Sequence, residues 1–193
     1  MSISDYCGTP MRVSVIVPTK NRINLLKIAI KSIVSQTYQP CEIIIIDDGS
    51  DGDDILNLIE TMNEPRIKLL RHNPSKGANY SRNIGIKNST SEYIAFLDDD
   101  DYWLPQKLEK QIEVFKKQNV GAVYCGFDYY NVITGERKVS NRFNYASGNI
   151  FEQLLVEDIT ASTPTYLIRR DCFEKAGYFD EELSANEDWD FHF

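Results

Sequence analysis

The chain has 193 residues, of which 42% are hydrophobic and 26% are charged, and its formal net charge is -8. This composition predicts a soluble globular protein with one well-buried domain, and it disfavours nucleic acid as a partner because a phosphate backbone requires clustered Lys and Arg. The four cysteines form no C-x-x-C pair, and no run approaches the roughly 18 apolar residues of a membrane span. The scattered cysteines suggest neither a zinc site nor a disulfide framework, so a reducing cytoplasm is the expected location, and the N-terminus does not resemble a signal peptide.

Four strand-helix pairs are predicted in succession between residues 13 and 117. The predicted strands are Val13 to Val17, Glu42 to Ile46, Arg66 to Arg71 and Tyr93 to Leu97. The helices after them are Asn24 to Ser35, Asp53 to Met62, Gly77 to Lys87 and Lys107 to Lys117. The apolar strand runs lack alternation, which is typical of parallel strands buried on both faces. Right-handed crossovers between such strands predict a Rossmann-like, mostly parallel open α/β sheet flanked by helices.

The sequence pattern changes after about Val120, where Tyr, Phe and Val become more frequent. This predicts a smaller antiparallel element in the last third of the chain, with a turn at Thr134-Gly135. The expected elements are extended segments over Val120 to Tyr130 and Ile133 to Phe143, a helix over Ser147 to Val156, a strand over Tyr166 to Arg169 and a helix over Asp171 to Ala176. A further helix is expected to begin near Asn186, and the chain ends inside it, so we expect a C-terminal truncation.

Four consecutive aspartates, Asp98 to Asp101, directly follow the hydrophobic strand at Tyr93 to Leu97. Carboxylates this close repel one another, and the cost becomes acceptable when a cation lies among them or a helix N-terminus lies beside them. Such hard oxygen ligands suit magnesium, manganese or calcium. The alternative is that the aspartates only end the strand and cap the helix that starts near Pro105. For four adjacent acids we favour metal binding.

The loops after the other three strands are also polar. They comprise Pro18 to Arg22, Asp47 to Ser50 and Asn73 to Arg82. Each loop alone is compatible with an ordinary turn or cap. Ligands of open parallel sheets bind at the carboxyl ends of the strands, however, and all these loops converge there. A carboxylate of the Asp47-Asp48 pair is suited to a nucleobase N–H or ribose hydroxyls, and Arg82 is suited to a phosphate.

Several common nucleotide and metal motifs do not fit the sequence. The first strand-to-helix loop contains neither G-x-G-x-x-G nor G-x-x-x-x-G-K-[ST], which disfavours a dinucleotide oxidoreductase and a P-loop NTPase. A calcium loop over Asp47 to Leu58 fails because Gly49 and Leu58 occupy two of its ligand positions. The phosphates of a nucleotide would therefore need another binding group, and a divalent ion held by the aspartates is the candidate.

Four segments of the chain, in order, resemble the successive motifs of family 2 glycosyltransferases with the GT-A fold. They are V-S-V-I-V-P-T-K-N-R, E-I-I-I-I-D-D-G-S-D-G, N-P-S-K-G-A-N-Y-S-R-N-I-G and Y-I-A-F-L-D-D-D-D-Y-W-L-P. The resemblance implies a single GT-A domain over residues 1–193, with a nucleotide-binding half over about 10–118 and an acceptor-side half over about 119–193. It also implies a nucleotide-diphosphate sugar donor, with UDP as the default, a Mg²⁺ or Mn²⁺ ion, and transfer with inversion.

The resemblance further implies roles for individual positions. Thr19 and Asp48 would line the nucleoside pocket, Asp98 and Asp100 would form the D-x-D metal motif, and Asp99 would lie beside the ribose or sugar. Arg82 matches the family's arginine between the third and fourth strands, whereas Lys20 stands where an aromatic residue is often found. The full set of candidate donor-binding residues is Pro18, Thr19, Asn21, Asp48, Gly77, Arg82, Asp98 and Asp99.

The segment N-E-D-W-D at residues 186–190 resembles the family's E-D motif, in which the aspartate removes the proton from the acceptor hydroxyl. Asp188 is therefore the first candidate for the catalytic base and Glu187 the second, because both can lie in one helical turn. The alternative is that these acids only stabilise the first turn of a helix through its dipole.

The function predicted from the residues and the resemblance together is inverting hexosyl transfer to a hydroxyl acceptor, in cell-surface polysaccharide or glycolipid synthesis. The acceptor would be a saccharide or a lipid-linked saccharide, met in the cytoplasm or at the inner face of the membrane through a segment that is not present. Two alternatives remain. One is a nucleotide-sugar-binding module without catalysis. The other is a sugar-nucleotide pyrophosphorylase, although Pro18-Thr19-Lys20-Asn21 replaces the glycine-rich loop that it would need.

Overall fold

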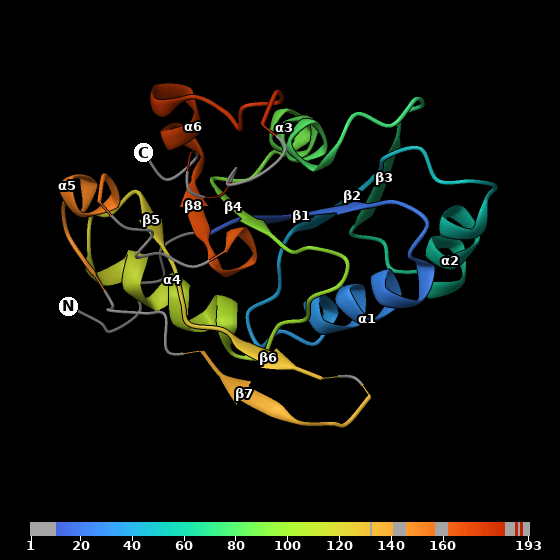
Figure 1. The fold of residues 1–193 in the computed structure, drawn as a ribbon, viewed down its shortest axis with the longest axis horizontal. Helices are drawn as coiled ribbons and strands as arrows, with labels where there is room; N and C mark the ends of the chain where they lie inside the picture. The colour runs from blue at the N-terminus through green and yellow to red at the C-terminus, as the bar shows by residue number, and fades with distance from the viewer. Residues whose placement is uncertain are drawn as a thin grey trace, which may run out of the picture.

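The structure is a computed structural model and describes residues 11–131, 133–140, 146–156, 162–183, 188 and 190. Its main sheet is built around four parallel strands (Figure 1), which are β1 (Val13–Thr19), β2 (Glu42–Asp47), β3 (Ile67–Arg71) and β4 (Tyr93–Phe96). They lie in the order β3-β2-β1-β4, with Val15 of β1 paired to Ile43 of β2 on one side and to Ala95 of β4 on the other. The chain order therefore reverses between β1 and β4, and the predicted parallel open sheet is confirmed.

Helices cover both faces of this sheet, as predicted for strands that are apolar along their whole length. Helices α1 (Ile23–Val34), α2 (Asp54–Met62) and α4 (Lys107–Lys117) pack on one face, against alternate strand residues such as Val15, Ile43 and Ala95. Helix α3 (Ala78–Asn88) packs on the other face (Figure 1), against the intervening residues such as Ile16 and Ile44. The sheet therefore has a buried hydrophobic core on each of its two faces.

Helix α3 approaches β1 closely because Gly85 carries no side chain at the contact. A Cβ atom built on Gly85 would lie 2.4 Å from Cγ2 of Ile16, which is far inside contact distance. This close approach places the amino-terminal half of α3 next to the carboxyl ends of β1 and β4.

The last third of the chain differs in part from the prediction. Its elements are β5 (Ala122–Val123), β6 (Asp128–Tyr130), β7 (Arg137–Val139), α5 (Phe151–Leu154), the 3₁₀ helix η2 (Thr163–Thr165), β8 (Leu167–Arg169) and α6 (Arg170–Ala176). The predicted antiparallel hairpin exists as β6 and β7, but its strands are short. The helix expected over 147–156 covers only the four residues Phe151–Leu154, and Gly148, within the expected range, has a φ of 85° that is not helical.

Strand β8 extends the main sheet rather than forming a separate element. It pairs antiparallel with β4 and with β5, which gives the full order β3-β2-β1-β4-β8-β5. Asp188 and Asp190 have helical backbone, and the rest of the helix expected near Asn186 lies outside the described residues. None of the helices within the described ranges is long and apolar enough to cross a membrane.

Candidate functional site

A pocket of about 370 Å³ lies at the carboxyl ends of β1 and β4, where the strand order reverses. This is the place at which open parallel sheets bind their ligands. Its walls are formed by Pro18, Thr19, Lys20, Arg22, Asp48, Ala78, Arg82, Asp98, Asp99 and Asp100. A second pocket, of about 320 Å³, lies near Tyr93 at the opposite end of β4 and contains none of the predicted site residues.

The buried carboxylate of Asp99 joins β1 to the end of β4. It accepts a hydrogen bond from Oγ1 of Thr19 at 2.7 Å, and it lies 3.1 Å from Nη1 of Arg22. The same Arg22 nitrogen lies 3.0 Å from Oδ2 of Asp100, whose side chain is 53% exposed. Arg22 therefore partly compensates the charge of two of the four consecutive aspartates.

Asp98 is held by the buried guanidinium of Arg82, whose Nη2 is 2.9 Å from Oδ1 of Asp98. Burial raises the pKa of Asp98 above its ordinary value, although 29% of its side chain still reaches solvent. Arg82 opposes this rise, while the negative charges of Asp188 and Asp100 add to it. The carboxylates around Asp98 thus carry more negative charge than the two guanidinium groups offset, which favours a cation at this place.

A divalent ion shared with a bound diphosphate fits this donor set. Within the described ranges, no three His, Cys, Asp or Glu side chains are grouped so that they could hold a metal by themselves. Mg²⁺ commonly takes only one or two carboxylates from the protein and completes its shell with water and substrate phosphates. Asp98 and Asp100, on the wall of one pocket, are the two carboxylates that would serve.

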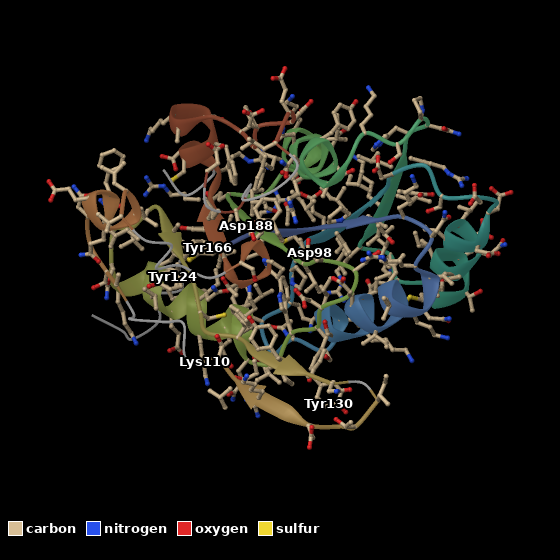
Figure 2. All side chains as sticks on the ribbon, in the orientation of Figure 1. Asp98, Lys110, Tyr124, Tyr130, Tyr166 and Asp188 are labelled. Atoms are coloured by element: carbon tan, nitrogen blue, oxygen red, sulfur yellow. The ribbon has the colours of Figure 1, made fainter. Side chains whose placement is uncertain are left out.

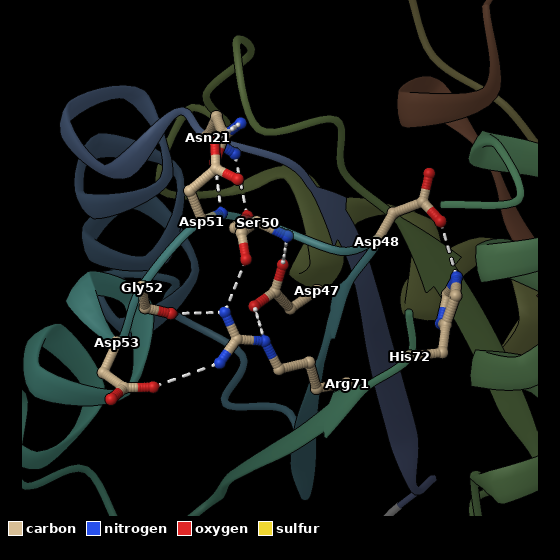
Figure 3. A network of polar contacts seen from close by, with 9 residues as sticks. All are labelled: Asn21, Asp47, Asp48, Ser50, Asp51, Gly52, Asp53, Arg71 and His72. Atoms are coloured by element: carbon tan, nitrogen blue, oxygen red, sulfur yellow. Dashed lines mark hydrogen bonds and ion pairs between the residues drawn. The ribbon is translucent and has the colours of Figure 1, made fainter. Parts of the chain in front are cut away.

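Asp48 holds the loop between β3 and α3 against the pocket. Its carboxylate accepts hydrogen bonds from Oγ of Ser75 at 2.6 Å and from the backbone N–H groups of Lys76 and Gly77 at 2.7 and 2.9 Å. Nε2 of His72 lies 2.5 Å from the same carboxylate (Figure 3). Burial raises the pKa of Asp48, but these four hydrogen bonds outweigh it and lower the pKa below its ordinary value. The structure therefore shows Asp48 with its main acceptor positions already used by the protein.

Asp47 points the other way from Asp48, as successive residues of a strand do. Its carboxylate lies 3.0 Å from Nε of Arg71 and accepts a hydrogen bond from the N–H of Ser50 at 2.8 Å. Figure 3 shows this second network beside Asn21, whose amide side chain exchanges hydrogen bonds with Asp51. Of the Asp47-Asp48 pair, only Asp48 reaches the pocket wall.

Two of the predicted donor-binding residues, Asn21 and Gly77, are adjacent to the pocket but are not part of its wall. Asn21 has a left-handed backbone with a φ of 55° and fastens the β1–α1 loop to the turn after β2. Gly77 has a φ of 94°, which favours glycine, and directs its N–H at Asp48. In the structure both residues shape the loops around the pocket.

We expect Asp48→Asn to lower the free energy of unfolding at neutral pH by about 3 kcal/mol, because hydrogen bonds to a charged group contribute about 1.5–3 kcal/mol each and are not additive. Ser75→Ala removes one of the four bonds and should cost about a third as much. Because the native pKa of Asp48 is lowered, its stabilisation is present above the unfolded value of about 3.8 and is lost as the pH falls through the native value. Urea unfolding at pH 7 and pH 3 should therefore show a smaller difference between parent and variant at pH 3; an equal difference would contradict this.

Asp188 lies close to Asp98 (Figure 2), near enough that its charge raises the pKa of Asp98, and it accepts a hydrogen bond from Oγ1 of the buried residue Thr163. Thr163 belongs to η2, which packs beside β4, and the indole N–H of Trp103 donates to the carbonyl of Pro164 at 3.0 Å. The side chain of Asp188 is thus fixed from the core of the protein. Glu187, the second candidate base, lies outside the described residues.

Sequence reasoning missed three side chains that define this site. Arg22 was part of a quoted motif but received no role, His72 stood next to a predicted loop, and Thr163 gave no recognisable signal. Their importance arises from contacts with Asp99, Asp48 and Asp188, which are 77, 24 and 25 positions away in the chain. Only the three-dimensional arrangement brings these partners together.

An open parallel sheet with an acidic pocket at the reversal of strand order defines a Rossmann-like α/β protein. Residues 14–178 match the model of the family described as Glycosyl transferase family 2, and the chain belongs to this family. A relative from Rickettsia felis, named an uncharacterized glycosyltransferase, is 34% identical over 177 residues, which is 92% of this chain and 29% of the relative. The chain therefore spans less than a third of that relative.

A second relative, from Escherichia coli, is 36% identical over 119 residues, covering 62% of this chain and 47% of its own length. It is named UDP-Glc:alpha-D-GlcNAc-diphosphoundecaprenol beta-1,3-glucosyltransferase WfgD. Among solved structures, S. aureus TarS 1-349 in complex with UDP-GlcNAc superposes with a TM-score of 0.74 at 24% identity, over 94% of this chain and 52% of TarS. This likeness shows the GT-A fold, which confirms the predicted fold class.

Proposed function

We propose that this chain carries the donor site and the base of an inverting glycosyltransferase that uses a nucleotide-diphosphate sugar. The observation that supports it most directly is the joint position of the aspartate cluster and Asp188. Asp98 and Asp100 line one pocket, and the charge of Asp188 is close enough to raise the pKa of Asp98. Asp98 and Asp100 thus offer carboxylates that would hold a metal ion beside the diphosphate of the donor. Asp188 offers a separate carboxylate for proton removal.

In this proposal Asp188 removes the proton from the acceptor hydroxyl while that oxygen attacks the anomeric carbon. A single displacement with the base on the side opposite the leaving group inverts the anomeric centre. When bound, a divalent ion neutralises the charge that develops on the departing diphosphate. Arg22 and Arg82, which hold Asp99 and Asp98, keep the carboxylates oriented and add positive charge at the same wall. Thr163 orients Asp188 from the core side.

UDP is the proposed nucleotide, and a lipid-linked saccharide is the proposed acceptor. The name of WfgD gives a UDP-glucose donor and a diphosphoundecaprenol-linked acceptor for that relative, and TarS binds UDP-GlcNAc in its crystal structure. A lipid-linked acceptor would place the reaction at the inner face of the membrane. We further propose that residues 1–193 form one GT-A domain, in which the nucleotide-binding half ends at about residue 118.

A thermal-shift comparison of UDP-, GDP- and dTDP-sugars, each with and without Mn²⁺, tests the donor assignment. We expect the largest rise in Tm with a UDP-sugar and Mn²⁺ together, and a much smaller rise with either alone, because the ion and the diphosphate complete each other's binding. A larger shift with a GDP-sugar would mean that the donor nucleotide is GDP rather than UDP. No shift with any nucleotide sugar would overturn the donor site itself.

Release of UDP from the preferred sugar, measured over time, separates an enzyme from a binding module. An enzyme transfers the sugar to water slowly and to an acceptor faster, with UDP as the leaving group in both cases, whereas a module without catalysis binds the donor and leaves it intact. A sugar-nucleotide pyrophosphorylase would instead form the sugar phosphate and a nucleoside triphosphate when supplied with pyrophosphate. Product identification by chromatography distinguishes these three outcomes.

A further inference from the structure

Two buried amide side chains on α3 hold the turn that leads to Asp188. Asn83 is 2% exposed and exchanges two hydrogen bonds with the backbone of Phe179. The N–H of Phe179 donates to Oδ1 of Asn83 at 3.0 Å, and Nδ2 of Asn83 donates to the carbonyl of Phe179 at 2.9 Å. One turn earlier on the helix, Nδ2 of Asn79 donates to the carbonyl of Asp180 at 2.8 Å. Both amides therefore hold backbone about 100 residues away in the chain.

Asparagine has no advantage inside a helix, because its side chain competes for backbone hydrogen bonds. At these two positions it does something that an apolar residue cannot do. Residues 179 and 180 are not assigned to a strand in the described part of the chain, and backbone N–H and C=O groups that leave water need hydrogen-bond partners. Asn83 supplies a donor and an acceptor at once, as a neighbouring strand would, and Asn79 supplies a further donor.

The same helix face reaches the donor pocket. Nη1 of Arg82 donates to Oδ1 of Asn79 at 3.1 Å, and the other terminal nitrogen of Arg82 holds Asp98. The ring of Phe179 packs edge-to-face on Phe96, the last residue of β4, with 5.4 Å between the ring centres. The buried ring of Phe179 thus joins α3 to the end of β4, while Asp180 to Leu183 are exposed and attached to α3 through the amides. Asp188 follows Leu183 by five positions.

We propose that Asn79 and Asn83 are positioning residues of the transferase site, which hold residues 179–183 against α3 and so fix Asp188 relative to Asp98. This inference rests on the proposed role of Asp188 as the base. A displacement of about 1 Å at a reacting group can cost about 100-fold in rate, so the amides act on turnover without touching the substrate. Thr163 holds the carboxylate of Asp188 from one side, and the two asparagines hold the preceding chain from the other.

The test compares Asn83→Ala and Asn79→Ala with Asn88→Ala, a matched control at the exposed end of the same helix. The side chain of Asn88 donates to the carbonyl of Ile84 within α3, its own helix. Hydrogen exchange should show faster exchange of the Phe179 amide in Asn83→Ala and unchanged exchange in the control. Turnover, measured as UDP release, should fall about 10- to 100-fold in Asn83→Ala, while UDP affinity by calorimetry stays within about twofold. Asn79→Ala is the second variant if Asn83→Ala does not fold; because it also removes the acceptor for Arg82, its UDP affinity is measured to separate an effect on the donor pocket from one on turnover.

A double-mutant cycle with Asp188→Asn separates positioning from general destabilisation. If the amides act through Asp188, the substitution of either asparagine should have little further effect on turnover once Asp188 has been replaced. Unchanged exchange at Phe179, or full additivity in the cycle, would overturn the inference. A parent protein without any turnover would overturn the proposed function instead, and the exchange result would still show whether the turn is held by Asn83.

Discussion

Asp188→Asn should reduce transfer by about 10²- to 10⁴-fold, the usual contribution of a general base, and should leave UDP affinity unchanged within about twofold. The amide keeps the size of the side chain and can still accept from Thr163, but it cannot take a proton. Because Asp188 is not on the wall of the donor pocket, its replacement should alter kcat rather than donor binding. Initial rates of UDP release, combined with calorimetry of UDP, measure both effects on the same preparation.

Asp190→Asn is the matched control for this experiment. It removes the same charge from an exposed position two residues further on, and we expect it to retain the parental rate. Glu187→Gln should be measured in parallel, since Glu187 is the second candidate for the base. A parental rate in Asp188→Asn, with a large loss in Glu187→Gln, would transfer the role to Glu187. Parental rates in both variants would mean that neither Asp188 nor Glu187 is the catalytic base.

The fold up to Lys117 followed closely from the sequence, because each element has a strong local signal. The uninterrupted runs Glu42 to Ile46 and Tyr93 to Leu97 predict strands buried on both faces, and the structure places strands there within a residue. After Val120 the local signal is weaker and pairing depends on distant partners. Strand β8 was expected as a short strand, but its antiparallel place between β4 and β5 is set by tertiary contacts.

The candidate site was predictable to the extent that topology determines it. Loops that follow parallel strands meet at one edge, so Thr19, Asp48, Arg82 and Asp98 were expected to converge, and they share one pocket. The direction of each side chain was not predictable from the motifs alone. Asn21, for example, was expected to bind the donor, but its side chain instead exchanges hydrogen bonds with Asp51 in the neighbouring loop. Sequence offers no signal for contacts such as that of Asn83 with Phe179, which joins residues 96 positions apart.

Asp100→Asn should weaken UDP binding at least about tenfold in the presence of Mn²⁺ and should leave it nearly unchanged in the absence of the ion. Even residues that only support a metal ligand are worth about 10- to 100-fold in affinity or activity, and a direct ligand is worth no less. The overall stability should change little, because the ion pair of Asp100 with Arg22 is half exposed and such pairs contribute about 0–1 kcal/mol. Calorimetry of UDP with Mn²⁺ and with EDTA separates the two conditions.

Asp101→Asn is the control from the same run of aspartates, since Asp101 is exposed and lines no part of the pocket. Burial and the neighbouring charges of Asp98, Asp100 and Asp99 raise the pKa of Asp101 to about 6, so the comparison is made at pH 8, where Asp101→Asn removes the same charge one residue away. A general electrostatic effect would then appear in both variants, whereas the loss of a metal ligand would appear only in Asp100→Asn. Equal losses with and without Mn²⁺ in Asp100→Asn would mean that this carboxylate acts on the nucleotide directly. Combined with Asp188→Asn, the two substitutions assign separate steps to the two acidic parts of the site: Asp100 to donor binding with the ion, and Asp188 to proton removal from the acceptor.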